Sequence, residues 1–157
     1  MYSVTIRAVM QALLKHIATL GPIGYLPFAP GTFGSLAGLV SVWFFPLSLQ
    51  WHLLLIISGT LIGSLAATAA EKQFKQKDSG KIIIDEFIGI YVTVILIPRT
   101  PAFLIAAFLL FRFFDIFKPL MIRNIENALK NGKGVMADDI LAGIYANAIL
   151  QIWVRLI

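Results

Sequence analysis

The chain has 157 residues, of which 59% are hydrophobic and only 13% are charged, and its mean hydropathy is +0.85. A soluble globular domain is about 45–50% apolar and about 25% charged, so this composition indicates one domain whose solvent is mostly lipid. The absence of cysteine excludes disulfides, thiolate metal sites and cysteine nucleophiles. The formal charge of +5 comes from basic residues in loops between apolar runs, which is typical of membrane orientation rather than of nucleic-acid binding.

Residues 1–20 predict an amphipathic helix and not a cleaved signal peptide, because they contain no continuous apolar stretch. We expect this helix to lie in the membrane interface or to pack against the rest of the chain. One side carries Arg7, Gln11 and Lys15, and the other carries Ile6, Met10, Leu13 and Ile17.

Five apolar runs follow and predict an all-α, multi-pass transmembrane helical bundle of four to five spans, which with the amphipathic helix forms one membrane domain over residues 1–157. Several runs are shorter than the ~20 residues that cross a bilayer, a deficit that tilt or local thinning can meet. The first run contains Pro46, so it could instead be a re-entrant pair of short helices. The runs are residues 36–49, 52–70, 82–97, 102–117 and 140–157.

The basic residues predict an orientation for these spans. If the amino terminus is cytoplasmic and all five runs cross, only Arg99 and Arg155 fall on the opposite side, and Arg112 lies inside the fourth run. Cytoplasmic segments of membrane proteins are rich in lysine and arginine, which supports this topology. The cytoplasmic segments then hold Arg7, Lys15, Lys72, Lys75, Lys77, Lys81, Lys118, Arg123, Lys130 and Lys133.

Five carboxylates fall near the same membrane face on this topology. Asp85 and Glu86 open the third span, Asp115 closes the fourth, and Asp138 and Asp139 open the fifth. Two like charges at ~4 Å repel by about 4 kcal/mol at an effective dielectric constant near 20, so a cluster of five needs compensation. Ionisable residues in membrane spans are usually functional.

Arg112 and Lys118 can share one helix side with Asp115, but two cations do not neutralise five anions. A divalent metal is the economical explanation, and oxygen ligands favour Mg²⁺ or Mn²⁺. Gly89 and Gly143 follow acids by four residues, and small side chains let membrane helices approach closely. The plainer alternative is that the acids are solvated helix ends.

A glycine- and proline-rich segment at residues 21–38 predicts an ordered loop before the first span, on the same side as the acids. Thr32 or Ser35 could cap that span, and the free amides beside Gly31 and Gly34 could bind an anion such as phosphate. A plain turn with a helix cap remains the alternative at this point.

Four segments in order resemble the phosphatidylglycerophosphatase A family: LPFAPGTFGSLAG (26–38), DSGKIIIDEFIG (78–89), FRFFDIFKP (111–119) and GVMADDILAG (134–143). The resemblance implies a bacterial inner-membrane phosphatase that depends on Mg²⁺ and converts phosphatidylglycerophosphate into phosphatidylglycerol at the cytoplasmic face. It also implies an acidic catalytic and metal-binding set, Asp85, Glu86, Asp115, Asp138 and Asp139, with phosphate-side partners Gly31, Thr32, Gly34, Ser35, Arg112 and Lys118.

Two other functions would also use membrane-face carboxylates. A small ion- or proton-coupled transporter could use the acids as transport ligands, but such sites usually lie near the midplane between paired repeats, and no repeat is evident. A CDP-alcohol phosphotransferase would need a spaced DGxxAR…G…D…D signature, which the sequence lacks. Oligomeric state is left open.

Overall fold

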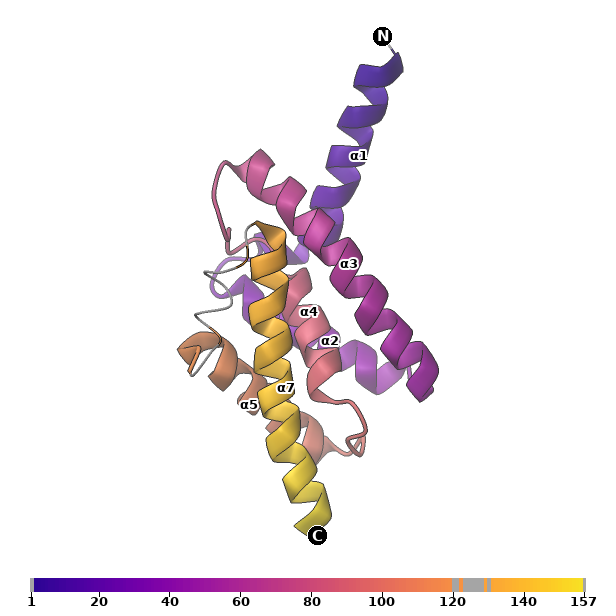
Figure 1. Cartoon of the computed structure of the whole chain (residues 1–157), viewed down its shortest axis with the longest axis vertical. Coiled ribbons are helices and arrows are strands. Elements are labelled where there is room, and N and C mark those ends of the chain that lie inside the picture. The colour runs from indigo at the N-terminus through magenta and orange to yellow at the C-terminus, as the bar shows by residue number, and fades with distance from the viewer. Residues whose placement is uncertain (1, 120–121, 123–128, 130, 157) are drawn as a thin grey trace.

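The computed structural model describes residues 2–119, 122, 129 and 131–156, and these residues form an all-α structure, as expected (Figure 1). A short 3₁₀ helix, η1 (Ile23–Tyr25), separates the first two α-helices. The α-helices of the described residues are α1 (Tyr2–Ala18), α2 (Pro30–Phe44), α3 (Leu49–Phe74), α4 (Ile84–Thr93), α5 (Pro101–Phe117) and α7 (Gly132–Leu156).

Helix α4 is the centre of the bundle, and α2, α3, α5 and α7 all pack against it. Glycines make the closest approaches. A Cβ atom on Gly38 would stand 3.0 Å from the carbonyl oxygen of Phe87, and one on Gly143 would stand 2.7 Å from that of Gly89. Helix α1 packs along α3 and projects beyond the body of the bundle (Figure 1). Small residues thus bring the α2 and α7 backbones against α4.

Two helices begin earlier than the sequence predicted. Helix α2 starts at Pro30 rather than at residue 36, because proline at the first helical position has its φ already set and needs no amide partner. Its cap residue is Ala29, and no side chain caps it, so the predicted cap by Thr32 or Ser35 is wrong. Helix α7 starts at Gly132 rather than at residue 140, which places its acids inside the helix instead of ahead of it.

Helix α4 covers only ten residues, although the third apolar run extends over 82–97. Its end is stabilised by two side chains of α7. The Asn147 side-chain amide on α7 donates to the carbonyls of Thr93 and Ile95, each at 2.8 Å, and Gln151 donates to Ile95 at 3.0 Å. Because these carbonyls have side-chain donors, the backbone can leave the helix without losing hydrogen bonds inside an apolar region.

By length and composition, two of the described helices could cross a membrane, α3 and α7. Only 22% of the most apolar stretch of α3 is buried within the protein, so most of that helix faces outward. Helices α2, α4 and α5 have 15, 10 and 17 residues, fewer than the ~20 of a full span. The four to five predicted spans therefore remain a proposal. Helix α1 exposes the apolar residues Ile6, Val9, Met10 and Leu13.

Candidate active site

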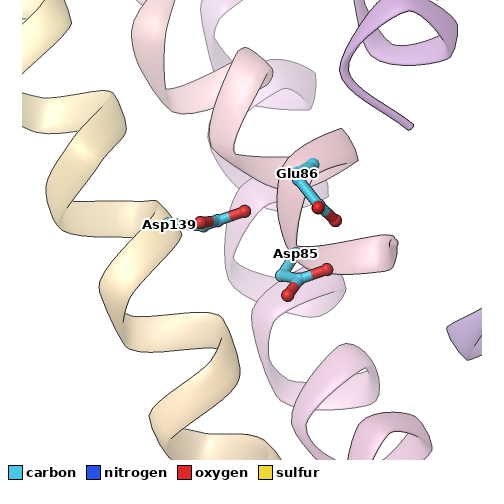
Figure 2. Close-up of side chains that lie close together, drawn as sticks. All are labelled: Asp85, Glu86 and Asp139. Atoms are coloured by element: carbon cyan, nitrogen blue, oxygen red, sulfur yellow. The ribbon is translucent and has the colours of Figure 1, made fainter. Parts of the chain in front are cut away.

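Three of the five predicted carboxylates converge at one place. Asp85 and Glu86 lie in the first turn of α4, and Asp139 lies on α7 and points toward them (Figure 2). One oxygen of each lies within 4.8 Å of the others. Asp85 and Asp139 are only 7% and 3% exposed. The sequence prediction that distant segments deliver acids to a common site is confirmed for these three.

Close packing of α4 and α7 produces this convergence. Gly89 lies one turn after Asp85 and faces both α5 and α7: an added Cβ would stand 2.5 Å from the Phe111 ring and 3.2 Å from the carbonyl oxygen of Asp139. Gly143, one turn after Asp139, lies against the backbone of Gly89. A larger residue at either glycine would separate the helices. The glycine spacing therefore sets the distance between the acids on the two helices.

The electrostatics of this cluster call for a cation. Asp85 Oδ1, Glu86 Oε2 and Asp139 Oδ2 are buried and, within the part of the chain that is described, have no hydrogen-bond partner. Buried, unpaired carboxylate oxygens that also repel one another are costly. Their hard oxygen donors fit a divalent ion such as Mg²⁺ or Mn²⁺. The cluster could therefore bind a metal.

The other two carboxylates are paired with basic side chains. Near the end of α5, the guanidinium of Arg112 donates to Asp115 and lies 3.9 Å from Glu86. Lys118, directly after α5, donates to Asp138 at 2.5 Å. Arg112 thus lies beside the acidic cluster, and Lys118 binds the residue next to Asp139. We expected all five carboxylates to hold metal; the structure brings three of them together and pairs the other two with basic side chains.

The glycine-rich segment reaches the same site. Gly31 lies so close to Glu86 that an added Cβ would stand 2.1 Å from its Oε1 and 3.3 Å from Nη1 of Arg112. Gly34 contacts Ile83, the residue that precedes α4, and Glu86. The first turn of α2 is therefore placed beside the acids, as expected.

The polar groups of this turn are partly engaged within it. The Ser35 hydroxyl is buried and donates to the carbonyl of Gly31 at 2.9 Å, and the amide of Thr32 bonds to the carbonyl of Ala29 at 2.9 Å. Ser35 thus stabilises the turn, while the half-buried Thr32 side chain lies on the turn that contacts Glu86. Phosphate binding by these residues stays a prediction.

Sequence reasoning missed one buried acid. The predicted run 52–70 ends just before Glu71, but this residue lies on α3, is 8% exposed, and accepts a hydrogen bond from the amide of Asp78 at 2.9 Å. The signal was present, because Glu71 continues the small-residue stripe of Gly63, Ala67 and Ala70 at helical spacing. Its role is to hold the loop that precedes α4.

Comparison with known proteins identifies the family of this chain. The family model described as phosphatidylglycerophosphatase A matches residues 16–154. The chain belongs to the phosphatidylglycerophosphatase A family. It is therefore an enzyme of that family, which decides against the transporter alternative.

Two similar proteins have the name of this family, and a third has another name. The chain is 37% identical over 155 residues to phosphatidylglycerophosphatase A of Haemophilus influenzae, covering 89% of this chain and 95% of that protein. It is 36% identical over 139 residues to the protein of the same name from Escherichia coli, covering 86% and 80%. A relative from Bacteroides thetaiotaomicron, provisionally named a phosphatidylinositol-3-phosphatase, is 38% identical over 143 residues, covering 83% and 88%. No solved structure matches the chain.

Proposed function

We propose that this protein is a Mg²⁺-dependent lipid phosphatase that hydrolyses the terminal phosphomonoester of phosphatidylglycerophosphate to phosphatidylglycerol and phosphate. The observation that carries the proposal is the buried cluster of Asp85, Glu86 and Asp139, whose unpaired oxygens are suited to a divalent cation. Family membership supports the reaction class and the phospholipid substrate.

Asp85, Glu86 and Asp139 would hold the ion. A divalent cation bound there would polarise the phosphate oxygens and activate a water molecule. The protein itself supplies positive charge at the edge of the site. Arg112 lies between Glu86 and Asp115, so its guanidinium is oriented before substrate arrives. A guanidinium held in this way is suited to bind a phosphoryl group and to stabilise charge on it during bond cleavage.

The paired acids have a positioning role in this scheme. Asp115 accepts from Arg112, and Asp138 accepts from Lys118, so each carboxylate fixes one cation beside the cluster. The first turn of α2, which contains Gly31, Thr32 and Gly34, packs against Glu86 at one side of the site. In hydrolysis, water forms the new bond to phosphorus, the ester oxygen departs with the electrons of the broken bond, and that oxygen gains a proton.

The membrane is part of the proposal. We place the chain in the bacterial inner membrane as one domain of four to five spans, with α1 in the interface and the site at the cytoplasmic face. Exposed apolar side chains on several helices and the loop distribution of lysine and arginine support this arrangement. A site near the interface suits a lipid whose phosphate lies in the headgroup layer.

Phosphate release by the purified protein tests the proposal. In detergent micelles with phosphatidylglycerophosphate, we expect release with Mg²⁺ and none with EDTA. Equal release in EDTA would contradict the metal requirement. A parallel assay with phosphatidylinositol 3-phosphate checks the substrate, because faster turnover of that lipid would assign the chain to the activity in the Bacteroides relative's name.

A further inference from the structure

Helices α2 and α5 form an apolar groove on the outside of the bundle. The groove encloses about 250 Å³ and is lined by apolar residues of these two helices. Three of its residues, Val40, Trp43 and Ile105, are 53%, 47% and 59% exposed, so the groove opens to the surroundings. Its lining consists of Leu39, Val40, Trp43, Phe44, Pro101, Leu104 and Ile105.

The same two helices bound the acidic site. Gly31, at the start of α2, lies beside Arg112, near the end of α5. The groove joins residues 39–44 of α2 with residues 101–105 of α5, so the helices run antiparallel from the site to the groove. On α5, Ile105 and Arg112 are seven residues apart and share one helix side.

An apolar path connects the two places. On α2, Phe33, Leu36, Val40 and Trp43 follow one another at helical spacing and are all exposed. On α5, Leu109 lies between Ile105 and Arg112 on the same side and is also exposed. On α5 the path therefore runs from Arg112, beside Glu86, to the groove. The exposed α2 residues form the outer wall, on the side of α2 away from Gly31.

Its length fits a phospholipid. Nine residues separate Gly31 from Val40 and seven separate Ile105 from Arg112, which at 1.5 Å per residue is about 10–13 Å along the helices. The terminal phosphorus of phosphatidylglycerophosphate is separated from its first acyl carbon by roughly eleven bonds, about 14 Å when extended, given single bonds of about 1.5 Å. A phosphate at the acids would thus place the start of an acyl chain at the mouth of the groove.

We propose that this groove binds one acyl chain of the lipid substrate while its terminal phosphate lies at Asp85, Glu86 and Asp139. This inference rests on the proposed function. The groove selects lipid over water-soluble phosphomonoesters, because apolar contact there adds to the binding of the headgroup.

The test compares lipids with long and short chains. Ile105→Trp and Val40→Trp each fill the groove from one wall. For dioleoyl phosphatidylglycerophosphate we expect kcat/KM to fall about tenfold, the equivalent of two lost methylene contacts. For the diacetyl lipid, whose two-carbon chains end at the mouth of the groove, we expect kcat/KM to stay within about twofold of wild type.

Ile57→Trp is the matched control, because Ile57 is also 59% exposed but lies on α3, outside the groove. We expect this variant to behave as wild type with both lipids. Equal losses with long and short chains in the groove variants, or a loss as large in Ile57→Trp, would overturn the inference and leave the proposed function standing. If wild type released phosphate from neither lipid, the proposed function would fall, and the inference with it.

Discussion

Gly31 and Glu86 are in direct contact: no side chain fits between the first turn of α2 and the carboxylate, because a Cβ at Gly31 would stand 2.1 Å from Oε1. The φ angle of Gly31 is not positive, so the requirement for glycine is spatial rather than conformational. The contact joins the glycine-rich segment to the acidic cluster and leads to the first prediction.

Gly31→Ala should reduce activity at least about tenfold, because the added methyl displaces Glu86 by an ångström or more and small displacements of catalytic groups are costly. Phosphate release at saturating lipid measures the effect. Gly80→Ala is the control, since nothing lies within 4 Å of a Cβ at Gly80. Wild-type turnover in Gly31→Ala would contradict a role for this contact.

Asp139→Asn and Asp85→Asn should abolish phosphate release and yet stabilise the metal-free protein. Each removes one of three buried carboxylates that repel one another. The thermal midpoint in EDTA should therefore be equal to or above that of wild type. Asp78→Asn, at an exposed loop position, should leave both quantities unchanged. If Asp139→Asn or Asp85→Asn unfolded in EDTA at a lower temperature than wild type, these acids would have a structural role instead.

Mg²⁺ should raise the thermal midpoint of the wild-type protein, because a ligand that binds only the folded state stabilises it. At a concentration about 100 times the dissociation constant, the stabilisation is about 2.7 kcal/mol. Asp139→Asn should lose most of this response. Thermal unfolding in detergent, with and without Mg²⁺, measures it without reference to turnover. An identical response in both proteins would place the ion elsewhere.

Arg112→Gln should lower kcat by about 10²-fold, a typical cost of removing one group that stabilises transition-state charge. It should also destabilise the protein, because Asp115 and Glu86 lose their cation. Adding Asp115→Asn removes one of the uncompensated charges, so stability should recover in the double variant while activity does not. Recovery of both would show that Arg112 acts only through Asp115.

Asn147→Ala should cost about 1–3 kcal/mol of stability, because the Thr93 carbonyl at the end of α4 loses its side-chain donor. Gln151→Ala should cost less, since Ile95 keeps the hydrogen bond from Asn147. Thermal midpoints of the two variants give the order. The reverse order would mean that these amides are not what stabilises the end of α4.

The sequence predicted the helical class, the approximate position of each apolar helix and the convergence of Asp85, Glu86 and Asp139. Helix starts were predicted less well. Hydrophobic runs mark where side chains are apolar, whereas α7 begins at Gly132, in a stretch with lysine and aspartate that hydropathy does not identify as helix. The prediction that Thr32 or Ser35 caps α2 was also wrong, since α2 begins with Pro30 and has no side-chain cap.

The division of the five acids could not be predicted from spacing. Asp138 and Asp139 are adjacent, yet one pairs with Lys118 and the other joins the cluster. Adjacent residues on a helix point about 100° apart, so which of them faces α4 depends on the rotation of α7. That rotation is set by contacts such as Gly143 against Gly89, which only the structure shows.

The brevity of α4 has a consequence for biosynthesis. Ten residues make a helix of about 15 Å, which is half of a bilayer core, and its first turn carries two carboxylates. On the proposed topology, this segment is a poor candidate for entering the membrane alone. On that topology its stable insertion would depend on α5 and α7, which are synthesised later and which supply Arg112 and the amides of Asn147 and Gln151. On this topology we expect α4 to reach its final position only after α7 has been made.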